Sequence, residues 1–136
     1  MAVETTFGGF VGNHRVLDAL TTLSFDYARR GDYFRTELEK FLLMTRNEAL
    51  DPAKPVGSFA GAMGLGQFMP SSFLNWAVDF NNDGRRDLWN PDDAIGSIAR
   101  YFADHGWQNG QPVVSATKGP LPASSPIEPG LDHPYD

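Results

Sequence analysis

The chain has 136 residues, which include 14 Gly, 10 Pro and no Cys, and its formal net charge is −6. This length allows one domain with a modest core. The acidic balance and the lack of a basic stripe exclude nucleic acid as the main partner. The absence of cysteine excludes a disulfide framework, thiolate metal sites and a cysteine nucleophile. Apolar runs such as residues 41–44 are too short for a transmembrane segment, and no secretion signal is visible at the start of the chain.

Apolar residues at helical spacing dominate the first 110 residues and predict a mainly α-helical protein. The first helix is expected over about residues 14–28. A second amphipathic stretch runs through residues 33–42, with Glu37 expected on its solvent side. Two X-Pro steps within residues 51–55 then break the helical pattern.

The second half of this region carries clear helix boundaries. A glycine-rich segment spans residues 57–66, and Pro70 suits the first turn of a short helix that reaches about residue 78. Asn90 can cap a last helix, which Gly106 can end. No alternating pattern predicts a strand. Six of the ten prolines lie beyond Gly110, so residues 111–136 are expected to form a mostly disordered tail outside a folded domain of residues 1–110.

The sharpest local motif is a run of oxygen-bearing side chains at Asp79, Asn81 and Asp83, followed by Gly84. This order matches the start of an EF-hand calcium loop, because a hard cation needs six to eight oxygen ligands and glycine permits the sharp turn around it. Arg85 would contribute only its backbone carbonyl. Asn90 stands where the standard loop has glutamate, and either Asp92 or Asp93 can close the site instead. The plainer interpretation is an Asx-rich surface turn without an ion.

Glu4, taken alone, is a surface residue near a chain end, but it belongs to a longer pattern. Residues 4–8, 15–27, 57–72, 79–87, 92–97 and 101–107 together resemble the lytic murein transglycosylase B family. The resemblance covers about residues 2–114, and its longest and most specific block is residues 58–72. It implies a lysozyme-like helical core with an EF-hand-like calcium loop, truncated at both ends relative to the family.

The resemblance also implies a reaction. The family cleaves the β-1,4 bond between N-acetylmuramic acid and N-acetylglucosamine in peptidoglycan and leaves 1,6-anhydromuramic ends. Glu4 is expected to be the single acid and base of this reaction. That role predicts a raised pKa in an apolar, partly closed site. The expected walls of that site are four apolar side chains: Phe7, Phe59, Met63 and Phe68.

The same matching assigns the other site residues. Ser58, Gln67 and Tyr101 are expected to contact the saccharide, although the glycine-rich segment also fits a tight helix connection and Tyr101 equally fits core packing. The calcium ligands implied by the family are Asp79, Asn81, Asp83, Arg85 and Asp93.

The expected partners are peptidoglycan glycan strands, with no nucleic acid and no transmembrane segment, and the protein is expected to be a monomer of the periplasm or cell envelope. Two alternatives stay open at this point. The chain can be a catalytically impaired fragment that binds glycan and calcium. It can also be a calcium-loop interaction domain, although such domains duplicate the loop and this sequence contains one.

Overall fold

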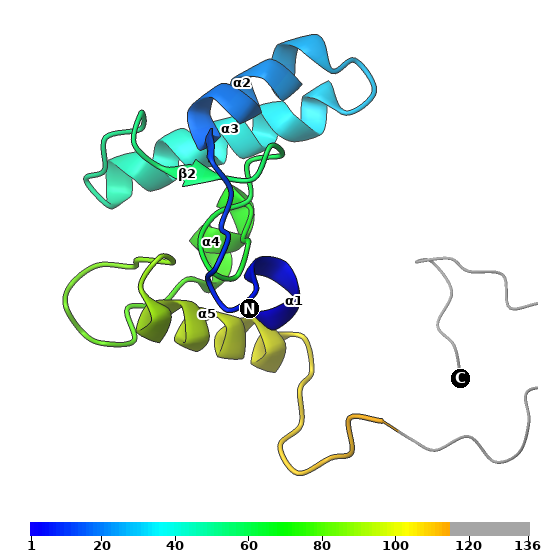
Figure 1. Ribbon diagram of the computed structural model, residues 1–136, viewed down its shortest axis with the longest axis vertical. Helices are drawn as coiled ribbons and strands as arrows, with labels where there is room; N and C mark the ends of the chain where they lie inside the picture. Colours follow the sequence, from blue (N-terminus) through cyan, green and yellow to red (C-terminus); the bar gives the residue numbers. More distant parts are fainter. Residues whose placement is uncertain (115–136) are drawn as a thin grey trace, which may run out of the picture.

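The computed structural model describes residues 1–114, so most of the predicted proline-rich tail lies outside the described part of the chain. Five helices and two short strands follow one another: α1 (Ala2–Thr5), β1 (His14–Arg15), α2 (Val16–Asp26), α3 (Gly31–Asn47), β2 (Val56–Gly57), α4 (Pro70–Trp76) and α5 (Pro91–Asp104). The predicted mainly helical class is confirmed. Figure 1 shows α4 between the α2–α3 pair and α5.

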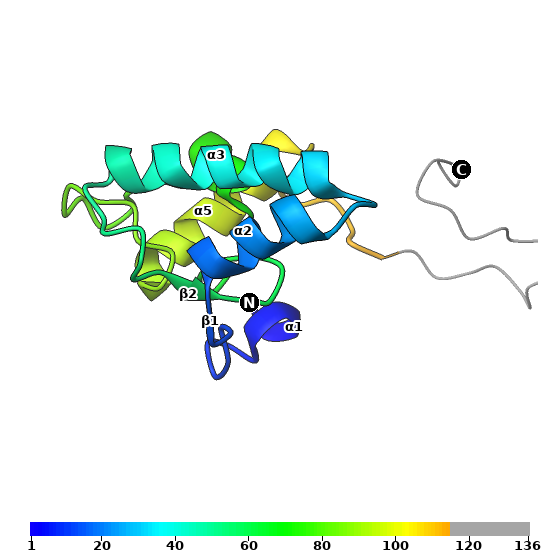
Figure 2. The ribbon, with the colours of Figure 1, turned by 90° about the horizontal axis from the view of Figure 1, so that it is seen from above.

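The core lies between α2, α3 and the segments that precede and follow α4. Helices α2 and α3 lie side by side, as Figure 2 shows from above. The buried apolar side chains on these helices repeat at helical spacing, and they are Val16, Leu20, Phe34, Phe41 and Met44. Phe73 of α4 and Met63 of the glycine-rich segment belong to the same cluster, together with Phe68, Ala77 and Leu88. The helix predicted over residues 14–28 begins and ends two residues inside those bounds.

The two strands were not predicted. They form a two-residue antiparallel ladder in which His14 faces Gly57 and Arg15 faces Val56. Such a pair is too short to show the alternation by which a strand is recognised in a sequence. The ladder joins the start of α2 to the glycine-rich segment. Glycine is required beside it, because a Cβ on Gly12 would lie 2.0 Å from the carbonyl oxygen of Gly57.

The prediction that Glu37 lies on the solvent side of α3 is wrong. Its relative exposure is 3%, and its carboxylate accepts hydrogen bonds from the backbone N–H of Ser71 at 2.9 Å and from the Ser71 hydroxyl at 2.7 Å. Ser71 lies in the first turn of α4, where a backbone N–H has no partner within the helix. Glu37 therefore ties α3 to the start of α4.

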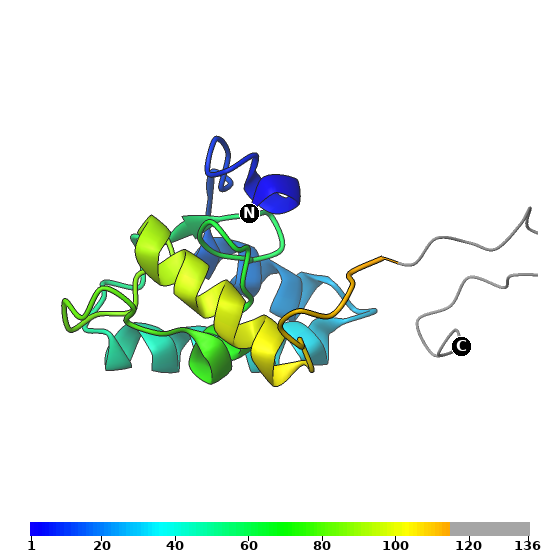
Figure 3. The same ribbon diagram turned by 90° about the horizontal axis from the view of Figure 1, so that it is seen from below.

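The N-terminal turn α1 lies at one side of the molecule. Figure 3 shows it beyond the loop that connects β2 to α4, on the side away from α3. Only one face of this turn packs against the rest of the protein, since Thr5 is buried whereas Ala2, Val3 and Glu4 are exposed. This placement decides the surroundings of Glu4.

Candidate functional site

A pocket of about 560 Å³ lies where α1 meets the residues before α4 and the face of α5. Three of the four residues predicted for catalysis and saccharide binding line it: Glu4, Gln67 and Tyr101. Gly66, Phe68, Met69 and Ser72 add part of its wall, and Ile98 and Phe102 of α5 close another side. Residues far apart in the sequence thus meet around one carboxyl group.

Glu4 is held in place through its neighbour Thr5. The Thr5 side chain is 2% exposed, and its hydroxyl donates a hydrogen bond of 3.0 Å to the carbonyl oxygen of Leu65. The same hydroxyl accepts a hydrogen bond of 3.1 Å from the backbone N–H of Gly8. The backbone turns sharply just afterwards, with φ of 51° at Thr6 and 54° at Phe7. A β-branched residue rarely adopts a positive φ, so this turn is strained beside the candidate carboxyl group.

The expected enclosure of Glu4 by four apolar side chains is wrong for the described residues. Phe68 lines the pocket, but Met63 is wholly buried in the core. Phe7 and Phe59 are 77% and 74% exposed and lie outside the pocket. Glu4 itself is exposed. The reason is the position of α1 at the edge of the protein, where residues 1–114 cover only the Thr5 side of the turn.

Gln67, which lines the pocket, takes an unusual backbone conformation with φ of 52°. Its Nε2 donates hydrogen bonds to the carbonyl oxygens of Gly64 at 3.0 Å and of Val11 at 3.1 Å. These bonds fix the amide and leave its oxygen as an acceptor for a ligand. A strained residue whose side chain is fixed by two hydrogen bonds is typical of a functional position.

Tyr101 packs against neighbouring rings and also lines the pocket, so the two interpretations of this residue are compatible. Its ring stacks on His105 with centroids 4.0 Å apart and meets Trp76 edge to face at 5.0 Å. These contacts fix the orientation of the phenol on α5.

Ser58 does not line the pocket of Glu4. Its hydroxyl oxygen accepts hydrogen bonds from the backbone N–H groups of Ala60 at 3.3 Å and Ala62 at 3.1 Å. It thereby stabilises the turn of the glycine-rich segment that leads to Gln67.

The predicted cation loop is organised by its own carboxylates. Asp79 accepts hydrogen bonds from the backbone N–H groups of Asp83 at 3.0 Å and Gly84 at 2.8 Å. Asn81 and Asp83 each accept one from the backbone two residues later. The oxygen-rich donor set suits a hard cation. Within residues 1–114, however, no group of three or more Asp, Glu or His side chains is arranged to hold a metal ion.

Asp93 is fully buried, although it is charged. Its Oδ1 accepts from the backbone N–H groups of Phe80 at 2.8 Å and Asn81 at 3.3 Å. Its Oδ2 accepts from the N–H of Asp87 at 2.8 Å. One carboxylate at the start of α5 thus anchors both ends of the loop.

The arrangement also depends on residues to which the sequence analysis gave no role. Thr5 and Glu37 position α1 and α4, and Ser72 of α4 lines the pocket. A signal for Glu37 was present, because it falls in phase with the buried residues Phe34, Phe41 and Met44 of α3. The buried bond of Thr5 has no such signal.

The family model described as the transglycosylase SLT domain matches residues 1–130. The chain belongs to this family. It is 57% identical over 122 residues to the membrane-bound lytic murein transglycosylase B of Escherichia coli (strain K12), covering 90% of this chain and 34% of that protein. This membership confirms the resemblance found in the sequence.

Solved structures of other members have the same fold. The E. coli lytic transglycosylase Slt35 in complex with calcium matches with a TM-score of 0.80 and 59% identity, over 82% of this chain and 36% of that one. The soluble lytic transglycosylase SltB1 of Pseudomonas aeruginosa matches with a TM-score of 0.81 and 57% identity, over 82% of this chain and 38% of that one. SltB3 of P. aeruginosa in complex with NAG-NAM-pentapeptide matches with a TM-score of 0.77 and 38% identity, over 82% of this chain and 30% of that one. The expected lysozyme-like fold is thus confirmed.

The chain spans about a third of the length of these relatives. In residues 1–114, none of the helices has the length and apolar character that a membrane crossing requires.

Proposed function

We propose that this protein is a lytic transglycosylase that cleaves the β-1,4 bond between N-acetylmuramic acid and N-acetylglucosamine in peptidoglycan. The observation that carries the proposal is the single pocket that brings Glu4, Gln67 and Tyr101 together. Its support from outside the chain is membership of a family whose relatives are named lytic transglycosylases.

The proposed reaction needs one carboxyl group. Glu4 donates its proton to the glycosidic oxygen as the bond from that oxygen to C1 of the muramic acid breaks. The 6-hydroxyl of the same sugar then bonds to C1, and the Glu4 carboxylate takes the hydroxyl proton. The product is a 1,6-anhydro ring, and no water is consumed. Glycosidases that use water or a covalent intermediate need a second carboxyl group, which this route replaces with the substrate's own hydroxyl.

Because Glu4 is exposed in the free protein, the substrate itself is proposed to shield it from water. A carboxylic acid holds its proton near neutral pH when it is removed from water. A glycan that fills the pocket covers Glu4 and excludes water from it. The bound polymer then supplies the enclosure that residues 1–114 do not.

Two residues are proposed to position the saccharide in the pocket. Gln67 offers its side-chain oxygen to a sugar N–H or O–H group, and Tyr101 offers its ring edge and hydroxyl. Ser58 is proposed to act at a neighbouring sugar position, because its hydroxyl can still donate a hydrogen bond while it accepts from the loop backbone.

A calcium ion is proposed for the loop between α4 and α5, held by Asp79, Asn81 and Asp83, the backbone carbonyl of Arg85, and Asp93. A bound ion would supply positive charge that draws these oxygens together and stabilises the loop. The support is the donor set of the loop and the calcium complex of Slt35. We further propose that the protein acts as a monomer in the periplasm or cell envelope, where its polymer substrate lies.

Matched glutamate variants test the activity. Wild type, Glu4→Gln and Glu39→Gln are incubated with purified peptidoglycan, and the products are analysed by mass spectrometry. Glu39 is exposed on α3 and lies outside the pocket. We expect anhydromuramic ends from wild type and Glu39→Gln, and a loss of about a thousandfold or more for Glu4→Gln, since the nearby pocket offers no second carboxyl group. Reducing ends in place of anhydro ends contradict the proposed reaction.

A second candidate function follows from the exposure of Glu4: a module that binds glycan without turning it over. It predicts that folded wild type and Glu4→Gln are equally inactive on peptidoglycan and retain the same affinity for glycan fragments.

A further inference from the structure

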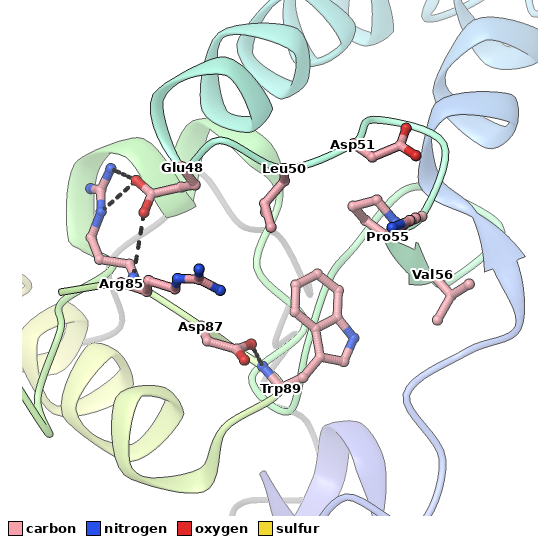
Figure 4. A pocket seen from close by; sticks show the side chains of 10 residues that line it. Glu48, Leu50, Asp51, Pro55, Val56, Arg85, Asp87 and Trp89 are labelled. Atoms are coloured by element: carbon pink, nitrogen blue, oxygen red, sulfur yellow. Dashed lines mark hydrogen bonds and ion pairs between the residues drawn. The ribbon is translucent and has the colours of Figure 1, made fainter. Parts of the chain in front are cut away.

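A second cavity, of about 360 Å³, lies on another part of the protein. Its walls come from the end of α3, from the loop before β2 and from the segment that leads into α5 (Figure 4). It shares no residue with the pocket of Glu4. Nothing in the proposed transglycosylase reaction uses it.

One wall of this cavity is held by an ion pair. The Arg86 guanidinium binds the Glu48 carboxylate through Nε at 3.0 Å and also through its Nη2, and it lies 4.9 Å from the centre of the Phe73 ring. These two charges neutralise each other. On the opposite wall the Asp87 carboxylate accepts a hydrogen bond of 2.9 Å from the backbone N–H of Trp89.

Arg85 is placed differently from its neighbour. Figure 4 shows its side chain extended into the cavity, between Glu48 and Leu50 on one side and Asp87 and Trp89 on the other. Among the ion pairs of residues 1–114, none involves Arg85 or the nearby Lys54. In the described residues neither cation is neutralised by an ion pair, so both can bind an anion, and the carboxylates of Asp51 and Asp87 in the same lining are likewise outside any ion pair.

Apolar side chains form another part of the lining. Leu50 and Val56 are 36% and 37% exposed, and the indole of Trp89 stands opposite Leu50 in Figure 4. Asp51 and Asp87 also line the cavity, and their charges disfavour a multiply charged anion such as a phosphate group. The lining thus suits a single carboxylate that is attached to an aliphatic body.

We propose that this cavity binds the terminal carboxylate of the peptide stems that peptidoglycan carries on its glycan strands. The planar guanidinium of Arg85 matches a carboxylate in a paired hydrogen-bond geometry, and the aliphatic side chains of the stem lie against Leu50 and Trp89. The cavity is at the small end of ligand pockets, which suits the end of a peptide better than a length of glycan. The assignment rests on the proposed function, since it takes peptidoglycan as the substrate.

The experiment uses the full chain with calcium present and two probes. One is a synthetic stem pentapeptide that ends in D-alanyl-D-alanine, and the other is the same peptide with its terminal carboxylate converted to an amide. Binding is followed by NMR through the backbone amides of residues 50–56 and 85–89, and each Kd is obtained by titration. We expect the acid to perturb these amides and to bind at least fivefold more tightly than the amide.

Variants then test the cation directly. Arg85→Gln keeps the backbone carbonyl offered to the calcium loop and is expected to remove the difference between acid and amide. Lys54→Gln, which lies outside the loop, is expected to weaken binding of the acid by a smaller factor. Arg29→Gln is the control, because Arg29 is exposed and lines neither cavity, and it should bind both probes as wild type does.

Three results overturn the inference: equal affinity for acid and amide, unchanged binding by Arg85→Gln, or perturbed amides only around Glu4 and Gln67. Its failure is separable from failure of the proposed function. Glu4→Gln should still bind the acid peptide. If wild type releases anhydro ends from peptidoglycan but the acid peptide leaves the amides of residues 85–89 unperturbed, the peptide site alone is refuted.

Discussion

The Thr5 hydroxyl and the Leu65 carbonyl oxygen, 60 residues apart in the sequence, are joined by a buried hydrogen bond of 3.0 Å. This bond attaches the turn that carries Glu4 to the segment that carries Gln67. Because α1 is a single turn with one buried face, its position depends strongly on this contact. The side chain next to the candidate acid is therefore a positioning residue.

Replacement of Thr5 tests this role. Thr5→Val keeps the shape but leaves the Leu65 carbonyl oxygen without its donor, which costs about 1–3 kcal/mol of stability. We expect kcat on peptidoglycan to fall about tenfold or more, since small displacements of a catalytic group reduce rates strongly, while KM changes little. Thr5→Ser retains the hydroxyl and should restore most of the rate. Equal loss of rate in both variants would assign Thr5 a packing role alone.

The bond between Glu37 and Ser71 is the second contact that shapes the pocket, because Ser72 follows directly. Glu37→Gln replaces a charged acceptor with a neutral one and is expected to lower stability by about 1–2 kcal/mol. Ser71→Ala and the double variant complete a mutant cycle in thermal unfolding. A coupling energy indistinguishable from zero would show that the two side chains act independently.

Glu37 also acts on a nearby phenol. Burial raises the pKa of Tyr33 above its ordinary value of 10.0, the Glu37 charge raises it further, and Arg30 lowers it. Because the pKa of Tyr33 is raised in the folded state, the neutral phenol contributes to stability. This contribution is fully present below pH 10.0 and is lost as the pH rises through the pKa of the folded state. Glu37→Gln should therefore shift the tyrosinate absorbance of Tyr33 to lower pH. Glu39→Gln serves as the control, and Tyr33→Phe identifies the signal.

Local signals in the sequence predicted the last helix well. Asn90 caps α5 by accepting a hydrogen bond of 2.9 Å from the N–H of Asp92, and Pro91 occupies its first turn. These features depend on neighbours in the sequence, so the residue types alone reveal them. The glycine-rich segment was likewise located from composition, although its role in bringing Gln67 to Glu4 was not.

The unpredicted features depend on contacts between distant segments. The β1–β2 ladder pairs residues about forty positions apart over two residues only, and the Thr5 bond spans 60. Neither leaves a periodic pattern. Glu37 is different: its helical phase agreed with burial, but a charged residue is usually exposed unless a partner is present, and the partner Ser71 lies on another helix. The exposure of Glu4 also follows from tertiary placement and not from its local motif.

Gly64 offers a test of the close packing behind the pocket. Its φ is 68°, and a Cβ there would lie 2.4 Å from Leu88 Cβ and 2.5 Å from the Leu88 carbonyl oxygen. Gly64→Ala is expected to lower the free energy of unfolding by about 3 kcal/mol or more, because backbone strain adds to a steric clash. Gly106→Ala has a φ of 90° but open space around the new methyl group, so it should cost only about 1–2 kcal/mol. Similar losses in denaturant unfolding would contradict the close approach.

The buried carboxylate of Asp93 separates anchoring of the loop from binding of an ion. Asp93→Asn removes the charge that accepts hydrogen bonds from three backbone N–H groups. Because these bonds do not involve an ion, the variant should lower the free energy of unfolding by about 2 kcal/mol or more whether or not calcium is present. Asp83→Asn changes an exposed carboxylate that is proposed to bind the calcium ion. It should reduce the increase in melting temperature that calcium causes and leave the melting temperature without calcium unchanged. Chelation is expected to lower the melting temperature of wild type, because an ion bound by the folded state alone stabilises it by mass action. Asp92→Asn, at the exposed neighbour of Asp93, is the control and should cost less than about 1 kcal/mol. A wild-type melting curve that is identical with calcium and with chelator would remove the ion from this loop, while the expected loss in Asp93→Asn would still stand.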